Sequence, residues 1–312
     1  MPVPVADVLR RPRPRGAGSS LRTRTRRAVL RGLFRGGIPR AVSTFRLPDN
    51  PDLEFVAIDS QVLEQLYWCG EQGWEPELLP WWRACCRGSR SVLELGTNIG
   101  YFAVQGATAA PRARYLAVEP HPVSARVCRE NLALNGLGSV EVLAVAAVAD
   151  PARASVELVI PWEQLGTPTV AFLPGGSELP RRMADRAGTA VRVPAVDVRS
   201  LLSDVDLLKL DVEGQEHALL AAAWQQLREH RPTVVVEVLP GTPLLRDVLV
   251  RLCTELAYTC YVPTPTTLVP LAPCRLRAVS LRSEYGVHDL VLCARDRLPT
   301  TVSELDAGNH PR

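Results

Sequence analysis

Two groups of carboxylates follow short apolar segments in this sequence, and the spacing of the first group indicates a nucleoside site. Glu94 lies in the apolar stretch Ser91–Leu95, which runs into a glycine-spaced turn. A second apolar run, Tyr115–Val118, ends in Glu119. A parallel strand, a glycine-lined turn, a helix and a next strand that ends in an acid about 20 residues later together form a nucleoside pocket, because that acid accepts hydrogen bonds from the ribose hydroxyls.

The turn between these two acids has the wrong spacing for a nicotinamide cofactor. Residues 96–100 read G-T-N-I-G, whereas G-x-G-x-x-G is the pattern that holds a pyrophosphate on a helix N-terminus. Glu94 would also repel a pyrophosphate, but it suits the ammonium group at the methionine end of S-adenosylmethionine. The first group therefore predicts a methyl-donor site, with a dinucleotide-dependent oxidoreductase as the disfavoured alternative.

The second group of acids is where we expect the chemical step. Asp211 and Glu213 follow the apolar stretch Val205–Leu210, and Glu237 ends the next apolar run. The carboxyl ends of parallel strands meet at one edge of a sheet, so these three side chains should lie close together. His217 lies four residues after Glu213, which would place both on one face of a helix. Any of the four could be the base that takes the proton from a hydroxyl nucleophile.

Two other roles remain open for these acids. The carboxylates of Asp211, Glu213 and Glu237 could bind a divalent cation that lowers the pKa of the hydroxyl. Alternatively, Asp211 and Glu213 only cap the following helix by accepting hydrogen bonds from its backbone.

Lys209 is the single lysine among 36 basic residues, and it lies two residues before Asp211. Arginine is not an equivalent, because its planar guanidinium group is larger and its charge more diffuse. We expect Lys209 either to pair with Asp211 or Glu237 and hold their charge state, or to contact the substrate. It is therefore included among the candidate catalytic residues.

Charge is unevenly distributed along the 312 residues. Residues 1–46 hold twelve arginines against a single acid, Asp7, so this leader carries +11 and the rest of the chain −8 of the overall +3. Nucleic-acid binding depends on neutralising phosphates, so an acidic body excludes DNA and RNA from the expected partners. Residues 21–36 could form a basic helix for a membrane surface, but the two glycines and short apolar stripe favour a solvated leader.

The eight cysteines form no C-x-x-C pair, and no histidine is placed to complete a zinc site. Scattered cysteines in a chain of this length are expected to be buried as small apolar side chains. Their free thiols indicate a reducing compartment. No run of eighteen apolar residues occurs. The sequence therefore predicts a cytoplasmic protein.

The order of apolar segments predicts a doubly wound α/β domain at residues 91–296. A helical cap at 47–90, with helices over 60–69 and 76–87, precedes it, and a flexible tail at 297–312 follows. Four tryptophans of the cap are expected to pack in the core or to support a lid, rather than to cover the substrate. They are Trp68, Trp74, Trp81 and Trp82.

An insertion at about 151–196 interrupts the alternation after the third strand. We expect strands over 140–146, 155–160 and 190–196, with a Gly- and Pro-rich segment over the active site between the last two. Alternation then resumes. The expected elements are strands over 205–210 and 233–238, helices over 215–230 and 243–256, and two final strands over 257–263 and 287–294, the last of them antiparallel.

Several motifs resemble the FkbM family of S-adenosylmethionine-dependent methyltransferases. They are the segment 70–75, L-E-L-G-T-N-I-G-Y-F at 93–102, V-E-P at 118–120, Asn131 with Leu134 and Asn135, and K-L-D-V-E-G-Q-E at 209–216. The last motif is the specific one. Two positions depart from the family pattern, because members usually have Asp in place of Glu94 and a small residue such as Ala in place of Thr97.

The resemblance implies a class I methyltransferase Rossmann-like fold, with a seven-stranded, mostly parallel sheet and a reversed last strand. It also implies O-methylation of a hydroxyl on a sugar or secondary metabolite, with S-adenosylmethionine as cofactor and a small-molecule acceptor as partner. A donor-binding module that acts through a protein partner, without turnover, is the alternative. The resemblance places Glu94, Gly96, Asn98 and Gly100 at the methionine part of the donor, Glu119 at the ribose and Asp150 at the adenine amine. Thr97 and Tyr101 are further expected donor-binding residues.

Overall fold

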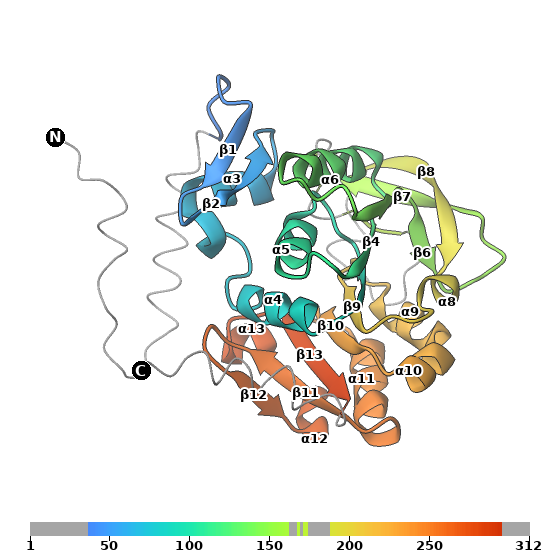
Figure 1. Ribbon diagram of the computed structural model, residues 1–312. Coiled ribbons are helices and arrows are strands. Elements are labelled where there is room, and N and C mark those ends of the chain that lie inside the picture. Colours follow the sequence, from blue (N-terminus) through green and yellow to red (C-terminus); the bar gives the residue numbers. More distant parts are fainter. Residues whose placement is uncertain (1–36, 162–166, 169–170, 174–187, 295–312) are drawn as a thin grey trace.

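The computed structural model describes residues 37–161, 167–168, 171–173 and 188–294. A large twisted sheet with helices on both faces forms the body, and an N-terminal cap and a small second sheet lie beside it (Figure 1). The expected basic helix at 21–36, the tail at 297–312 and most of the segment at 161–189 lie outside the described residues.

The large sheet has eight strands in the order β12-β11-β13-β10-β9-β3-β4-β5. Strand β3 is central, with β4 parallel to it on one side and β9 on the other, so the chain reverses its winding direction at β3. Strand β13 pairs antiparallel with β10 and β11 and is the reversed strand. The bounds are Ser91–Leu95 (β3), Arg114–Val118 (β4), Glu141–Leu143 (β5), Leu207–Leu210 (β9), Thr233–Glu237 (β10), Tyr258–Pro263 (β11), Leu268–Leu271 (β12) and Asp289–Ala294 (β13).

This strand order confirms the predicted class I methyltransferase fold. The sheet has one strand more than expected, because β12 folds back on β11 as an antiparallel hairpin at the edge. Alternate residues of the central strands point to opposite faces, as a sheet covered on both sides requires. Leu93 and Leu208 pack in one apolar cluster, whereas Val92 and Leu207 pack in the other.

The helices that cover the sheet follow the expected alternation with one exception. The single helix expected over 215–230 is broken at Ala223 into two short helices. The bounds are Tyr101–Ala109 (α5), Pro122–Leu134 (α6), Val198–Leu201 (α8), Glu216–Ala222 (α9), Trp224–His230 (α10), Pro243–Glu255 (α11), Pro273–Leu276 (α12) and Leu281–Glu284 (α13). None of the helices in the described part is long and apolar enough to cross a membrane.

The cap contains a β-hairpin that sequence reasoning missed. Strands β1 (Thr44–Leu47) and β2 (Asn50–Val56) pair antiparallel, so the expected leader boundary at residue 46 falls inside β1. Helix α3 (Gln61–Cys69), the turn η2 (Gly70–Gln72) and helix α4 (Leu79–Arg87) follow, and α4 packs beside α5 (Figure 1). Both expected cap helices are therefore confirmed.

Hydrogen bonds of Asn131 in α6 connect this cap to the body. Its fully buried side chain donates from Nδ2 to the carbonyl oxygen of Ile99 at 2.8 Å and accepts from the backbone N–H of Val56 at 2.9 Å. One amide thereby joins the glycine-spaced turn after β3 to strand β2. The position of the cap is thus coupled to the position of that turn.

The insertion forms a separate three-stranded sheet in the order β6-β8-β7. Strands β7 (Ser155–Pro161) and β8 (Gly188–Asp197) form the antiparallel pair expected from the sequence. The prediction of a single strand over 140–146 was wrong. The chain leaves the large sheet after β5 and enters the small one as β6 (Ala146–Val148).

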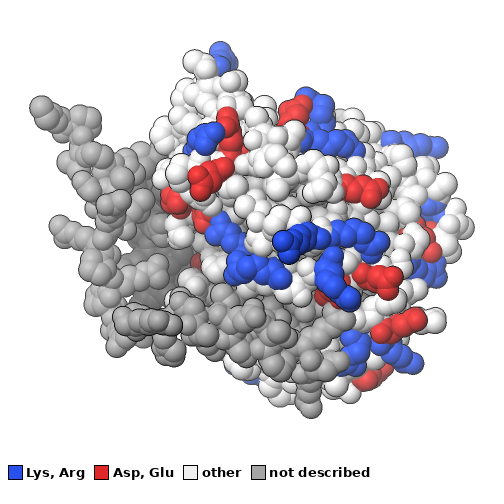
Figure 2. Space-filling model, in the orientation of Figure 1, with Lys and Arg blue, Asp and Glu red and all other residues white. Residues whose placement is uncertain are grey.

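Basic and acidic side chains both occur on the face shown in Figure 2, with basic ones gathered across its middle. Nothing in the structure tests the expected absence of a nucleic-acid partner, which stays a prediction.

Candidate active site

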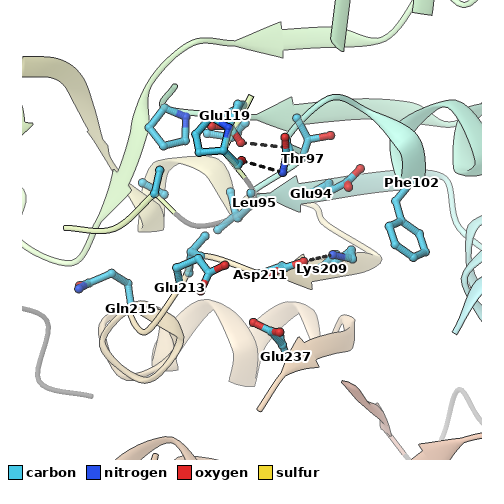
Figure 3. Close-up of a pocket in the computed structure, with 18 of the residues that line it drawn as sticks. Glu94, Leu95, Thr97, Phe102, Glu119, Lys209, Asp211, Glu213, Gln215 and Glu237 are labelled. Atoms are coloured by element: carbon cyan, nitrogen blue, oxygen red, sulfur yellow. Dashed lines mark hydrogen bonds and ion pairs between the residues drawn. The ribbon is translucent and has the colours of Figure 1, made fainter. Parts of the chain in front are cut away.

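A cavity of about 290 Å³ lies at the carboxyl ends of β3, β4, β9 and β10. This volume is just below the range of about 300–1,000 Å³ found for small-molecule sites. The described pieces of the insertion border it, and Asn98 Nδ2 donates to the carbonyl of Pro168 at 3.2 Å. Ten of the candidate residues line the cavity: Glu94, Gly96, Thr97, Asn98, Tyr101, Glu119, Lys209, Asp211, Glu213 and Glu237. Figure 3 shows Glu119 and Thr97 on one side of Asp211, and Glu237 on the other.

The two glycines of the turn after β3 permit close approach of neighbouring backbone. Gly96 has φ +83°, and a Cβ atom on it would lie 1.8 Å from the carbonyl oxygen of Asp211. This contact brings the donor turn and the β9 edge together. Gly100 has the same φ, but a Cβ there would meet Cys128 Sγ at 2.6 Å, and Gly100 does not line the cavity. The structure therefore gives Gly100 a packing role at the start of α5.

Glu119 sits where an acid that binds ribose is expected, at the end of β4. Its two carboxylate oxygens accept hydrogen bonds from the backbone N–H groups of Asn98 (2.9 Å) and His121 (2.8 Å). Burial is the main cause that raises the pKa of Glu119, to about 7, and these two hydrogen bonds oppose it. Each oxygen keeps a lone pair for a further donor.

Glu94 lies inside the cavity beside β9. Its Oε2 atom accepts a hydrogen bond from the Tyr115 hydroxyl at 2.5 Å. Burial raises the pKa of Glu94, while the nearby ammonium of Lys209 lowers it. The extra methylene of this Glu, relative to the Asp usual in the family, is therefore accommodated by a buried tyrosine.

Lys209 pairs with Asp211, one of the two partners expected from the sequence. The Nζ–Oδ2 distance is 2.9 Å, and Nζ also lies 4.8 Å from the centroid of the Phe102 ring. Lys209 is only 2% exposed. Burial alone would lower its pKa, but the surrounding carboxylates of Asp211, Glu75, Glu94 and Asp289 together raise it above its usual value. The ammonium group therefore stays charged inside the protein.

Asp211, Glu213 and Glu237 do meet at one edge of the sheet. A carboxylate oxygen from each lies within 4.8 Å of the others, close enough for the three to share a metal ion. Burial raises the pKa of Glu237 well above its usual value, and its neighbours Asp211 and Glu213 raise it further. Glu237 Oε2 is shielded from solvent and has no hydrogen-bond partner among the described residues.

His217 is not brought into this group. Helix α9 begins only at Glu216, and Glu213 (φ +53°) and Gly214 (φ +94°) form a left-handed turn before it. The four-residue spacing of Glu213 and His217 is therefore not a helical spacing, and His217 does not line the cavity. Glu216 does not line it either, but its buried carboxylate accepts from the backbone N–H groups of Val212 (2.9 Å) and Gly214 (3.0 Å). It holds the shape of this loop.

Asp150 also lies away from the cavity. Its side chain is 55% exposed and pairs with Arg153 at 3.5 Å. Strand β5 is only three residues long, and the chain then moves into β6, which carries Asp150 away from the edge of the large sheet. Ala146 and Ala147 of β6 line the cavity instead.

Sequence reasoning assigned no site role to Glu75, which enters from the cap between η2 and α4. Glu75 lines the cavity, has φ +41°, and its Oε2 atom is shielded from solvent without a hydrogen-bond partner in the described part of the chain. Trp74 lines the cavity as well, whereas Trp81 and Trp82 pack in the core and Trp68 is 43% exposed. The cap holds eight acidic residues between Asp49 and Glu77, so charge alone did not single out Glu75.

A comparison with protein-family models identifies the family of this chain. The family model for the methyltransferase FkbM domain matches residues 94–260, more than half of the chain. No curated protein matches. Among solved structures, methyltransferase FkbM from Methylobacillus flagellatus is 14% identical with a TM-score of 0.41, over 75% of this chain but only 55% of that one.

Two O-methyltransferases are similarly distant. The enzyme from Bacillus cereus, crystallised with SAH, is 12% identical over 71% of this chain and 80% of that one, with a TM-score of 0.39. TomG from Streptomyces achromogenes, crystallised with SAM, is 18% identical over 70% of this chain and 79% of that one, with a TM-score of 0.36. The fold assignment depends on the strand order of the large sheet and not on these likenesses. By its domain match, the chain belongs to the FkbM methyltransferase family.

Proposed function

We propose that this protein is an S-adenosylmethionine-dependent O-methyltransferase that methylates a hydroxyl group of a small sugar or secondary metabolite. The observation that carries the proposal is Glu119, which ends β4, is held by the backbone N–H of Asn98 in the glycine turn, and faces the cavity. We call Glu94, residues 96–100 and Glu119 the donor half. In this half Glu119 would bind the ribose hydroxyls and Glu94 the methionine ammonium group.

Methyl transfer to a hydroxyl is an in-line displacement. The oxygen forms a bond to the methyl carbon as the carbon–sulfur bond breaks, the electron pair stays on sulfur, and the hydroxyl proton passes to a base. Holding the two reactants in line can supply about 7–11 kcal/mol of the barrier. A positioned base contributes about 10²–10⁴ in rate. Asp211, Glu213 and Glu237 lie at the adjoining strand ends and are the proposed bases, with Lys209 paired to Asp211.

A divalent cation is the alternative use of these three carboxylates. The residues fit an oxygen-preferring ion, since three carboxylate oxygens converge and Glu237 Oε2 has no hydrogen-bond partner within the described structure. When bound, such an ion would lower the pKa of the acceptor hydroxyl. Calorimetric titration with Mg²⁺ and Mn²⁺ tests this. Binding that is lost in Glu237→Gln would support the cation, and turnover unaffected by a chelator would exclude it from the reaction.

Donor binding is tested by calorimetry with S-adenosylhomocysteine (SAH) and with NADH. We expect SAH to bind and NADH not to bind. Glu119→Ala should weaken SAH binding by about 1–3 kcal/mol, because it leaves ribose hydroxyls and two backbone N–H groups without an acceptor. Glu130→Ala, on the exposed side of α6, is the matched control and should leave the affinity unchanged. Tight NADH binding without SAH binding would reject the assignment.

A donor-binding module without turnover would pass that test, so activity must be measured separately. The readout is release of SAH with a set of hydroxyl acceptors. Turnover that is lost in Asp211→Ala and Glu213→Ala, while both variants still bind SAH, would support the enzyme. Absence of turnover with every acceptor, in a protein that binds SAH, would favour the module.

A further inference from the structure

The part of the cavity beyond the donor half has an excess of carboxylates. Once Glu94 and Glu119 are assigned to the donor, four acids remain, and Lys209 is the only basic side chain among the described residues of the lining. We call this part the acceptor half. It comprises Trp74, Glu75, Asp211, Glu213 and Glu237.

Two of these acids lack the hydrogen bonds that buried carboxyl groups normally make. Glu75 Oε2 and Glu237 Oε2 are both shielded from solvent, and neither has a partner in the described part of the protein. Leaving a buried acceptor unsatisfied costs about 1–3 kcal/mol. Glu75 is also held in a left-handed backbone conformation, which further disfavours a residue other than glycine or asparagine. A ligand that donates to these oxygens would remove the cost of the missing hydrogen bonds.

Trp74, the neighbour of Glu75, also lines the cavity. Aromatic rings and carboxylates together form the usual recognition set for organic cations, because the ring face is electron-rich and the carboxylate supplies the opposite charge. An anionic acceptor, such as a phosphorylated sugar or a coenzyme A thioester, would instead meet four carboxylates.

We propose that the acceptor half binds a positively charged group, so that the acceptor is a hydroxyl compound carrying an amine near the methylated oxygen, and that Glu75 is the residue that selects it. This inference depends on the proposed function, because it names the acceptor class of the same site. The amine donates to Glu75 and Glu237, and the hydroxyl lies towards Asp211. Glu75 reaches the cavity from the cap and is separate from the three carboxylates that could share a metal ion.

Sinefungin tests this subsite without knowledge of the acceptor. This donor analogue carries a primary ammonium group where S-adenosylmethionine carries its transferable methyl group. Calorimetry with SAH and sinefungin should show sinefungin binding at least about tenfold more tightly. The preference should fall below about threefold in Glu75→Gln. Glu77→Gln, in the same loop but outside the cavity lining, should keep it.

The outcomes separate the two proposals. If neither SAH nor sinefungin binds, the proposed function fails. If SAH binds and sinefungin binds no better, or if Glu75→Gln keeps the full preference, the inference about the acceptor half is wrong while the donor site stands. SAH affinity equal to that of the wild type shows that Glu75→Gln is folded. Should that variant not fold, Glu237→Gln must show the same loss of preference.

An acceptor that turns over provides a second measurement. Acetylation of its amine removes the charge and keeps the hydroxyl, and kcat/KM should then fall at least about tenfold in the wild type and much less in Glu75→Gln. Efficient turnover of an acceptor without an amine would overturn the inference.

Discussion

The two halves of the cavity differ in how their carboxylates are satisfied. In the donor half, Glu119 accepts from two backbone N–H groups and Glu94 from the Tyr115 hydroxyl. In the acceptor half, Glu75 and Glu237 each keep a buried oxygen that the described protein does not satisfy. Both donor-half carboxylates therefore have hydrogen-bond partners before any ligand arrives, although Thr97 Oγ1 and Asn98 Oδ1 of the same half have none among the described residues. The carboxylates of Glu75 and Glu237 instead need a ligand to complete their hydrogen bonds.

The halves also differ in how the chain builds them. The donor half comes from one strand–turn–helix–strand unit between residues 91 and 119. The acceptor half is assembled from the cap loop, the end of β9 and the end of β10, which are far apart in the sequence. Contacts between the halves are therefore the places where a substitution should have the largest effect.

The largest effect is expected for Gly96→Ala, which acts where the halves meet. Its Cβ would lie 1.8 Å from the carbonyl oxygen of Asp211, so β3 and β9 must separate, and φ +83° strains any alanine. Backbone strain and overpacking together should cost about 3–5 kcal/mol in the free energy of unfolding, measured by denaturant titration. Gly286→Ala is the matched control, since Gly286 has φ +80° but no atom within 4 Å of its Cβ position.

That control should lose only the strain, about 1–2 kcal/mol. An equal loss in the two variants would show that the approach of β9 to the donor turn does not constrain Gly96.

The next largest effect is expected for Asn131→Ala, which detaches the cap from the donor turn. It leaves the backbone groups of Ile99 and Val56 unsatisfied in the interior, so the free energy of unfolding should fall by about 2–4 kcal/mol. Asn135→Ala is the comparison, because Asn135 also binds the hairpin, through both backbone groups of Glu54, but is partly exposed. Water can replace its hydrogen bonds, so the loss there should be smaller.

The contrast between the halves also explains what could be predicted from the sequence. The donor half was predictable because strand, turn and acid are local, and only Gly100 among its residues turned out to serve packing rather than the cavity. Asp211, Glu213 and Glu237 were predictable because parallel strands align their carboxyl ends.

Glu75 was not predictable, because its place depends on how the cap docks, and the hairpin that docks it was missed. His217 lies outside the cavity lining for a local reason, since Glu213 and Gly214 adopt left-handed conformations before the helix begins. Asp150 lies outside the cavity lining because the strand expected over 140–146 is divided between two sheets.

A smaller effect is expected from a change of pH. It should act on SAH affinity through the charge of Glu119, which belongs to the donor half. Burial raises the pKa of Glu119 from 4.5 to about 7, so its carboxyl is mainly neutral at pH 6 and mainly ionised at pH 8. The ionised form accepts more hydrogen bonds from the ribose, so SAH affinity should rise about tenfold between these pH values. Calorimetry at both values measures this, and Glu119→Gln should flatten the dependence.

The stability of the empty protein should depend on pH in the opposite direction to SAH affinity, as far as Glu119 contributes to it. A raised pKa favours the folded state while the group is protonated, so its contribution is fully present below pH 4.5 and is lost as the pH rises through about 7. If the SAH affinity of the wild type did not depend on pH, ionised Glu119 would not be the form that binds the donor.

The smallest effect is expected for Asp150→Asn, which tests where the donor half ends. The Asp150 side chain is 55% exposed, pairs with Arg153 on the surface and does not line the cavity. An exposed ion pair contributes about 0–1 kcal/mol to stability, and a change outside the cavity should alter the SAH dissociation constant less than about twofold. Arg153→Gln breaks the same pair from the other side and should match it. A loss above about tenfold in Asp150→Asn alone would mean that β6 turns towards the adenine when the donor binds, so that the donor half extends into the insertion.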